Sequence, residues 1–93
     1  MEMLIIDDFR PWLGQPCEVA IGEYRLPMTL TIVEPVPGSD RKGGGFRLEF
    51  RGPASPVLAQ ATMCVQGPTG TRDIFLVPIA SDPQSARYEA VFY

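Results

Sequence analysis

The feature that most constrains the fold is a period-two alternation of apolar and polar side chains in residues 25–33. Successive side chains of a β-strand point to opposite faces, so this pattern is typical of a strand with one buried face. The side chains expected to point inward are Leu26, Met28, Leu30 and Ile32, with Val33 on the opposite face. Ten prolines and nine glycines in 93 residues favour short strands over long helices. We therefore predict an all-β fold.

Five further segments carry strand patterns, and Gly- and Pro-bearing turns separate them. These segments are residues 17–22, 46–52, 58–67, 74–80 and 87–93. Apart from residues 74–80, they are expected to turn inward Cys17, Val19, Ile21, Phe46, Leu48, Phe50, Ala59, Ala61, Met63, Val65, Tyr88, Ala90 and Phe92. About six antiparallel strands in a chain of this length favour a small barrel or roll. We expect one β domain that spans residues 1–93.

The segment "DDFRPWLG", residues 7–14, predicts a short helical turn before the first strand. Asp7 or Asp8 can cap this turn, and Pro11 keeps it short. The apolar side chains of the turn recur at i, i+3 and i+4, and they are Phe9, Trp12 and Leu13. The turn is therefore expected to close an open end of the sheet with these three side chains.

The sequence lacks the residues that most enzymatic and metal sites need. It contains no histidine, which removes His-based acid–base catalysis, Ser-His and Cys-His pairs and most zinc sites. The glutamates are scattered over faces that we expect to be solvated, namely Glu18, Glu23, Glu34, Glu49 and Glu89. We predict no catalytic, cofactor-binding or metal-ligating residue, no cofactor and no enzymatic activity.

Charge and hydropathy exclude two further classes of partner. The net charge of −3 and the pI of about 4.7 give no basic excess for nucleic acid or anionic lipid. No apolar run approaches the ~20 residues of a membrane span. The start "MEMLIIDDFRPW" has no basic segment before its apolar residues, so we expect no secretory signal and a cytoplasmic location. Cys17 and Cys64 are then expected as reduced thiols, although the pattern alone leaves a single bridge between them open.

Residues 74–79 are apolar on both faces, so both faces of this strand need a cover. One face carries Phe75, Val77 and Ile79, and the other carries Ile74, Leu76 and Pro78. The cover is either the N-terminal turn or a partner, and the pattern does not decide which face points inward. We predict a partner interface formed by Ile74, Leu76, Val91 and Tyr93.

The order of the motifs "FRPWLGQP", "FRLEFRGP", "PVLAQA", "IFLVPIASD" and "YEAVF" resembles an uncharacterised family of small bacterial all-β proteins. Members of that family are often encoded near phage-tail-collar-like genes. The resemblance spans nearly the whole chain and implies no established catalytic residue. It implies a structural or interaction accessory protein of a phage-tail-like assembly.

Two functional hypotheses follow. The first is a non-enzymatic accessory protein that binds a protein partner or forms a homo-oligomer. The alternative is a small-molecule binding β-barrel module, with a ligand at the barrel mouth near Trp12 and Tyr24. The first hypothesis depends on an exposed apolar face, and the second on a cavity, so the structure bears on both.

Overall fold

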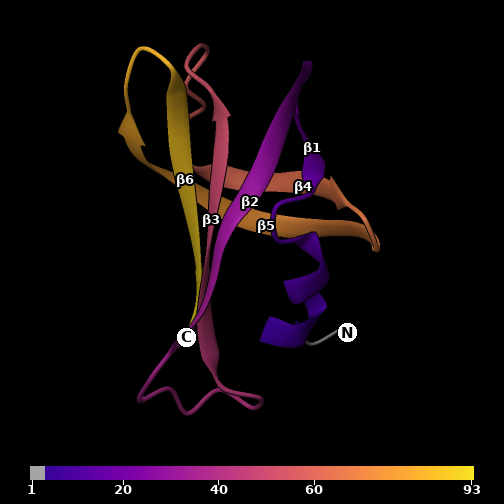
Figure 1. The fold of residues 1–93 in the computed structure, drawn as a ribbon, viewed down its shortest axis with the longest axis vertical. Helices are drawn as coiled ribbons and strands as arrows, with labels where there is room; N and C mark the ends of the chain where they lie inside the picture. The colour runs from indigo at the N-terminus through magenta and orange to yellow at the C-terminus, as the bar shows by residue number, and fades with distance from the viewer. Residues whose placement is uncertain (1–3) are drawn as a thin grey trace.

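The computed structural model of the protein describes residues 4–93 (Figure 1). Residues 1–3, part of the segment in which we expect no secretory signal, lie outside the described residues. Two 3₁₀ turns come first, η1 (Ile6–Asp8) and η2 (Arg10–Trp12). Six strands follow: β1 (Pro16–Ile21), β2 (Tyr24–Val36), β3 (Gly45–Pro53), β4 (Ala61–Gly67), β5 (Gly70–Ser81) and β6 (Ser85–Phe92).

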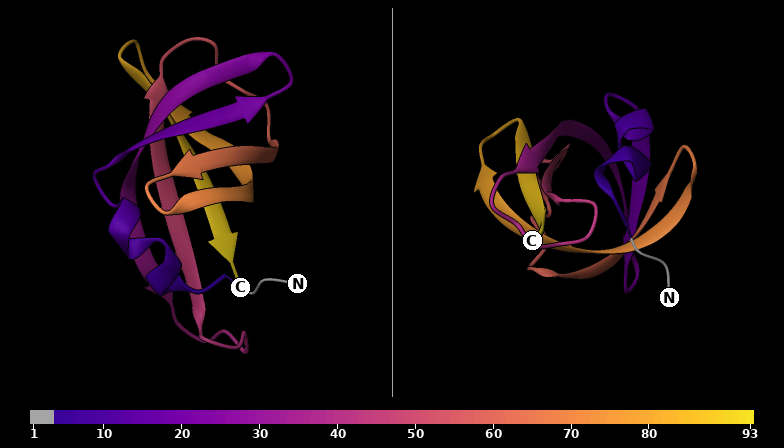
Figure 2. Two further views of the ribbon diagram at one scale, coloured as in Figure 1. Left: turned by 90° about the vertical axis from the view of Figure 1, so that its right-hand side faces the viewer. Right: turned by 90° about the horizontal axis from the view of Figure 1, so that it is seen from below.

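The six strands form a closed antiparallel barrel in the order β1-β2-β3-β6-β5-β4. The all-β fold and the short N-terminal helical turn are thus confirmed. Strands β2, β3 and β6 run side by side roughly along the long axis of the molecule, while β4 and β5 cross them at a large angle (Figures 1 and 2). Closure pairs every strand on both sides, which removes the open edges that would otherwise template aggregation.

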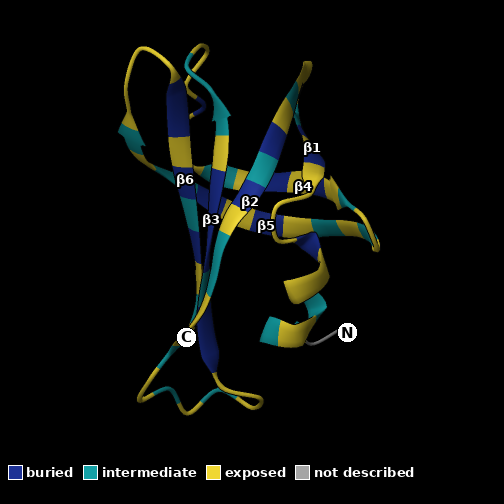
Figure 3. Cartoon of the chain, in the orientation of Figure 1, coloured by how far each residue is buried: buried dark blue, intermediate teal, exposed yellow. Residues whose placement is uncertain are grey.

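The interior of the barrel holds the apolar side chains of alternate strand positions. Buried and exposed positions alternate along the strands (Figure 3). The largest fully buried side chains are Trp12, Tyr88, Phe9, Phe46, Phe50, Leu30, Leu48, Met63, Ile74, Leu76, Val19 and Val65. The inward faces predicted for residues 17–22, 46–52 and 87–93 are therefore confirmed, because their alternate positions are buried or packed against this core.

A β-bulge in β2 overturns one expected face. The pairing of β2 with β3 shifts between Leu30 and Ile32, so that Val33 lies opposite the buried Leu48. Val33 packs against the core, whereas Ile32 lies opposite Glu49. Since a one-residue shift reverses every later side chain, the inward prediction for Ile32 and the outward one for Val33 are wrong.

The connection between β3 and β4 also differs from the expected strand. Strand β4 begins at Ala61, and the preceding residues place Leu58 inside and Ala59 outside. The backbone N–H of Leu58 donates a hydrogen bond to the Tyr88 hydroxyl, with 2.8 Å between the nitrogen and the oxygen. This bond satisfies a phenol in the barrel core. The prediction that Ala59 belongs to the inward face is therefore wrong.

The N-terminal turns insert two aromatic side chains into the barrel. Phe9 and Trp12 are fully buried and meet edge to face, with ring centroids 5.1 Å apart. The indole N–H of Trp12 donates to the Thr69 hydroxyl at 2.7 Å. The predicted plug is confirmed for these two rings. Leu13 corrects the prediction, because it is 48% exposed and its backbone bridges to Leu30 instead.

Candidate interaction surface

The outer wall of β5 carries different residues from those predicted. Ile74 and Leu76 are buried, beside the β4 residues Met63 and Ala61 with which they pair. Their assignment to a partner interface is therefore corrected, since side chains inside a closed barrel cannot touch a partner. Phe75, which alternates with them, is 52% exposed.

Apolar side chains gather instead on the outer face of β5 and β6 and just after β6, and all but the half-buried Val77 are exposed. We call these residues the apolar strip: Phe75, Val77, Ile79, Val91 and Tyr93. Val77 on β5 is half-buried and pairs with Glu89 on β6. Val91 lies two positions after Glu89 on β6, so Val77 and Val91 lie on neighbouring strands. Val91 and Tyr93 are more than half exposed, as the interface prediction requires. Whether they contact a partner stays a prediction.

The end of the strip is held by the β2–β3 hairpin loop, residues 37–44. The Tyr93 hydroxyl donates to the carbonyl oxygen of Gly38 at 2.9 Å, and the Ser39 hydroxyl donates to the carbonyl oxygen of Tyr93 at 3.3 Å. These two bonds fix the tyrosine ring while leaving it 59% exposed. A fixed aromatic side chain loses little further entropy when a partner covers it.

A network of ion pairs borders the strip on β2, β3 and β6. The Arg47 guanidinium contacts the carboxylates of Glu34, Glu49 and Glu89, and Arg87 contacts Glu49 at 3.0 Å. Glu49 is 5% exposed, so its expected place on a solvated face is corrected. The three carboxylates raise the pKa of Arg47 above its usual range. The network thus joins the outer faces of β2, β3 and β6 through charged hydrogen bonds.

Replacement of Glu49 tests the network. We expect Glu49→Gln to lower the free energy of unfolding by about 1–3 kcal/mol, because Arg47 and Arg87 lose their shared, desolvated carboxylate. Glu34→Gln is the matched control, and its half-exposed side chain predicts a loss below ~1 kcal/mol. Urea denaturation measures both. Equal losses in the two variants would contradict the expectation that the buried Glu49 contributes more to stability than the half-exposed Glu34.

The two cysteines point to opposite sides of the barrel wall. Both thiols are free, with Cys17 buried and Cys64 exposed. Their strands are neighbours, but Cys64 pairs with Ala20 and not with Cys17. The bridge that the sequence left open is therefore not formed, and burial raises the pKa of the Cys17 thiol.

This arrangement predicts two distinct thiol reactivities. A thiol reagent such as dithionitrobenzoate should modify Cys64 in the folded protein, because its side chain is exposed. Cys17 should react only after denaturant is added, since burial disfavours its thiolate. Absorbance of the released thiolate counts the reacted groups. Cys64→Ser should remove the native reaction, and rapid modification of both thiols in native buffer would contradict the structure.

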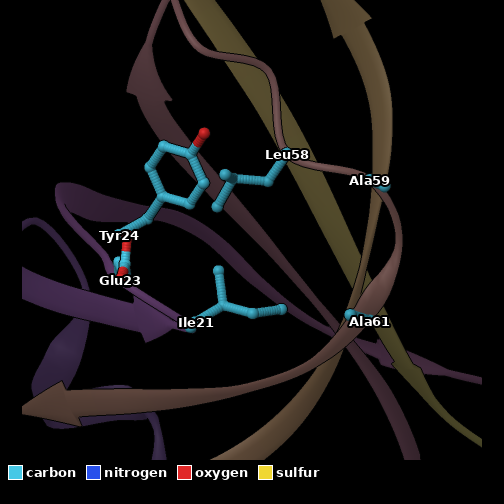
Figure 4. A pocket seen from close by; sticks show the side chains of 7 residues that line it. Ile21, Glu23, Tyr24, Leu58, Ala59 and Ala61 are labelled. Carbon is cyan, nitrogen blue, oxygen red and sulfur yellow. The ribbon is translucent and has the colours of Figure 1, made fainter.

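A groove lies at the end of the barrel formed by the β1–β2 hairpin and the β3–β4 connection. Its volume is about 590 Å³, and its lining residues are Ile21, Gly22, Glu23, Tyr24, Leu58, Ala59 and Ala61 (Figure 4). Tyr24 begins β2 and pairs with Ile21, the last residue of β1. The buried Trp12 precedes the first residue of β1, at the opposite end of that strand. The ligand site expected at the barrel mouth near Trp12 and Tyr24 is thus corrected to a groove lined by Tyr24 and not by Trp12.

The described residues form neither a metal-binding cluster nor a helix that could span a membrane. No three His, Cys, Asp or Glu side chains within residues 4–93 lie together as a metal ion would require. In the same part of the chain, no helix has the length and apolar character needed to cross a membrane.

Comparison with known proteins places the chain in a family. Residues 4–92 match the domain of unknown function DUF6916. Neither the curated proteins nor the solved structures give a match. The family match runs from the residues before η1 to the last residue of β6, so it covers both the N-terminal turns and the whole barrel. On this evidence the chain belongs to the DUF6916 family.

Proposed function

We propose that this domain is a non-enzymatic accessory protein that docks a protein partner on its apolar strip. The observation that carries the proposal is the exposure of Phe75, Val91 and Tyr93 on the outside of a barrel that buries its other large apolar side chains, such as those of Phe46 and Leu76, in its core. Contiguous exposed apolar side chains of this kind commonly mark protein interfaces. The strip also borders the ion-pair network, which would give an interface its polar rim.

The setting we propose is a bacterial, cytoplasmic, phage-tail-like assembly. The support is the resemblance of the chain's motifs to a family whose members are often encoded near phage-tail-collar-like genes. A structural role in such an assembly requires surface complementarity and no catalytic group. The lack of histidine and the net charge of −3 support a protein partner over a substrate or nucleic acid.

Association measurements with strip variants test this proposal. We expect tagged protein to capture a defined partner from cells that produce it, and Val91→Asp to abolish capture by burying a charge at the interface. Gln66→Asp is the matched control, because it adds the same charge at an exposed strand position on β4, outside the strip. Equal capture by both variants would contradict docking on the strip.

The second candidate function is binding of a small apolar molecule, which the Tyr24 groove supports. The side chains of Ile21, Tyr24 and Leu58 converge on it in Figure 4, and its volume of about 590 Å³ suits a small ligand. Ala59→Trp should fill the groove without disturbing the core, because Ala59 is exposed. Amide shifts that an apolar fragment induces around Tyr24, and that this variant loses, would favour the second function.

A further inference from the structure

A second groove, separate from both surfaces above, combines polar and rigid side chains. Its volume is about 420 Å³, and it lies where β2 and β3 meet the β5–β6 turn. Its lining residues are Pro16, Pro27, Met28, Thr29, Thr31, Arg51, Gly52, Pro53, Gln84 and Ser85. Three prolines give it stiff walls, and hydroxyl, amide and guanidinium groups give it hydrogen-bond donors.

The positive charge of this groove, Arg51, lies opposite another positive charge on the neighbouring strand. Arg51 is directly opposite Arg87 across β3 and β6, and like charges in such a position repel. Arg87 contacts the carboxylate of Glu49 at 3.0 Å, but it shares this carboxylate with Arg47. Within residues 4–93, the guanidinium of Arg51 forms no hydrogen bond and has no carboxylate within ion-pair distance.

Asp82 feels the charge of Arg51, but no direct ion pair joins the two side chains. Asp82 accepts hydrogen bonds on one carboxylate oxygen from the backbone N–H groups of Gln84 and Ser85, at 2.7 and 2.9 Å. These bonds are the main reason that the pKa of Asp82 is lowered, and the charges of Arg51 and Arg87 add to the effect. Asp82 thus shapes the β5–β6 turn, and the N–H donors of Arg51 stay available to the groove.

We propose that this groove binds a small oxyanion, a carboxylate or a phosphate, through the guanidinium of Arg51. The planar fork of an arginine matches both anions with two parallel hydrogen bonds. Thr29, the cross-strand partner of Arg51, supplies a hydroxyl donor on the same wall. The site is independent of the apolar strip, and it relieves the repulsion between Arg51 and Arg87 when it is filled.

The test is an NMR titration of isotopically labelled protein with inorganic phosphate and, in a second arm, with acetate. Ionic strength is held constant with sodium chloride. We expect saturable amide shifts, with millimolar affinity, at Thr29, Arg51 and Gln84. The arm with the tighter binding identifies phosphate or carboxylate as the preferred anion.

Variants decide whether Arg51 is responsible. Arg51→Gln should weaken binding at least ~10-fold, and Arg51→Lys, which keeps the charge but loses the fork, should retain part of it. Arg25→Gln is the control, because Arg25 is exposed on the β1–β2 hairpin, outside the groove, where it donates a hydrogen bond to the carbonyl of Tyr24. Shifts that rise linearly in both arms, or equal affinity in Arg51→Gln and the wild type, would overturn the proposal.

Discussion

Leu76→Asp is expected to unfold the domain, whereas Phe75→Asp should leave it folded. Leu76 is fully buried, so the variant would place an unpaired carboxylate in the barrel core. That cost exceeds the loss of ~2–5 kcal/mol expected for truncating a buried leucine, and it approaches the whole stability of a small domain, ~5–15 kcal/mol. Phe75, the next residue, points outward and is half exposed, so its replacement leaves the core intact.

Far-UV circular dichroism and urea denaturation of the two variants measure this contrast. The expected result is a disordered spectrum for Leu76→Asp and a β spectrum with a cooperative transition for Phe75→Asp. A folded Leu76→Asp protein together with an unfolded Phe75→Asp protein would mean that β5 pairs one residue out of register. The interface would then belong to Ile74 and Leu76.

Trp12→Ala is expected to lower the free energy of unfolding by ~3–5 kcal/mol, the usual cost of truncating a large buried aromatic side chain. The ring packs edge to face on Phe9 and donates a hydrogen bond to Thr69. It also lies over Gly67, where an added Cβ would come within 2.5 Å of the indole. Its loss therefore leaves a cavity that the neighbouring backbone cannot easily fill.

Leu13→Ala is the matched control for the N-terminal turns, with an expected loss below ~1 kcal/mol, because Leu13 is half exposed. Thermal and urea denaturation give the two differences in stability. Equal, small losses in both variants would show that the turns lie on the barrel without sealing it. Gly67→Ala should destabilise the protein through the same contact, since its methyl group would displace the Trp12 ring.

The barrel was predictable because its strands show one-sided alternation. Residues 46–50 and 88–92 have apolar side chains at every second position, and these positions face the core. Residues 74–79 carry no such asymmetry. Their faces were decided by closure of the barrel, which sets Leu76 opposite Ala61 and Val77 opposite Glu89. No local pattern contains that information.

The ion pairs of Glu49 could not be predicted from the sequence either. The buried carboxylate of Glu49 contacts Arg87, which lies 38 residues away along the chain. The two meet because β3 and β6 are neighbours in the barrel. The bulge in β2 likewise has no glycine to signal it, and it exchanges the faces of Ile32 and Val33. The burial of Glu49 and the faces of Ile32 and Val33 therefore follow from pairing between distant strands, which the alternation of side chains along one strand does not predict.

Site-specific photo-crosslinking in cells that produce the protein would show whether a partner docks on the apolar strip. A photoreactive phenylalanine analogue would replace Phe75 or Val91 in turn, with Thr71 on the same strand as Phe75 serving as an exposed control outside the strip. We expect one defined adduct from both strip positions and none from Thr71. An adduct that contains a second copy of this chain would show that the protein forms a homo-oligomer through the strip. Adducts from all three positions alike, or from none, would contradict docking on the strip.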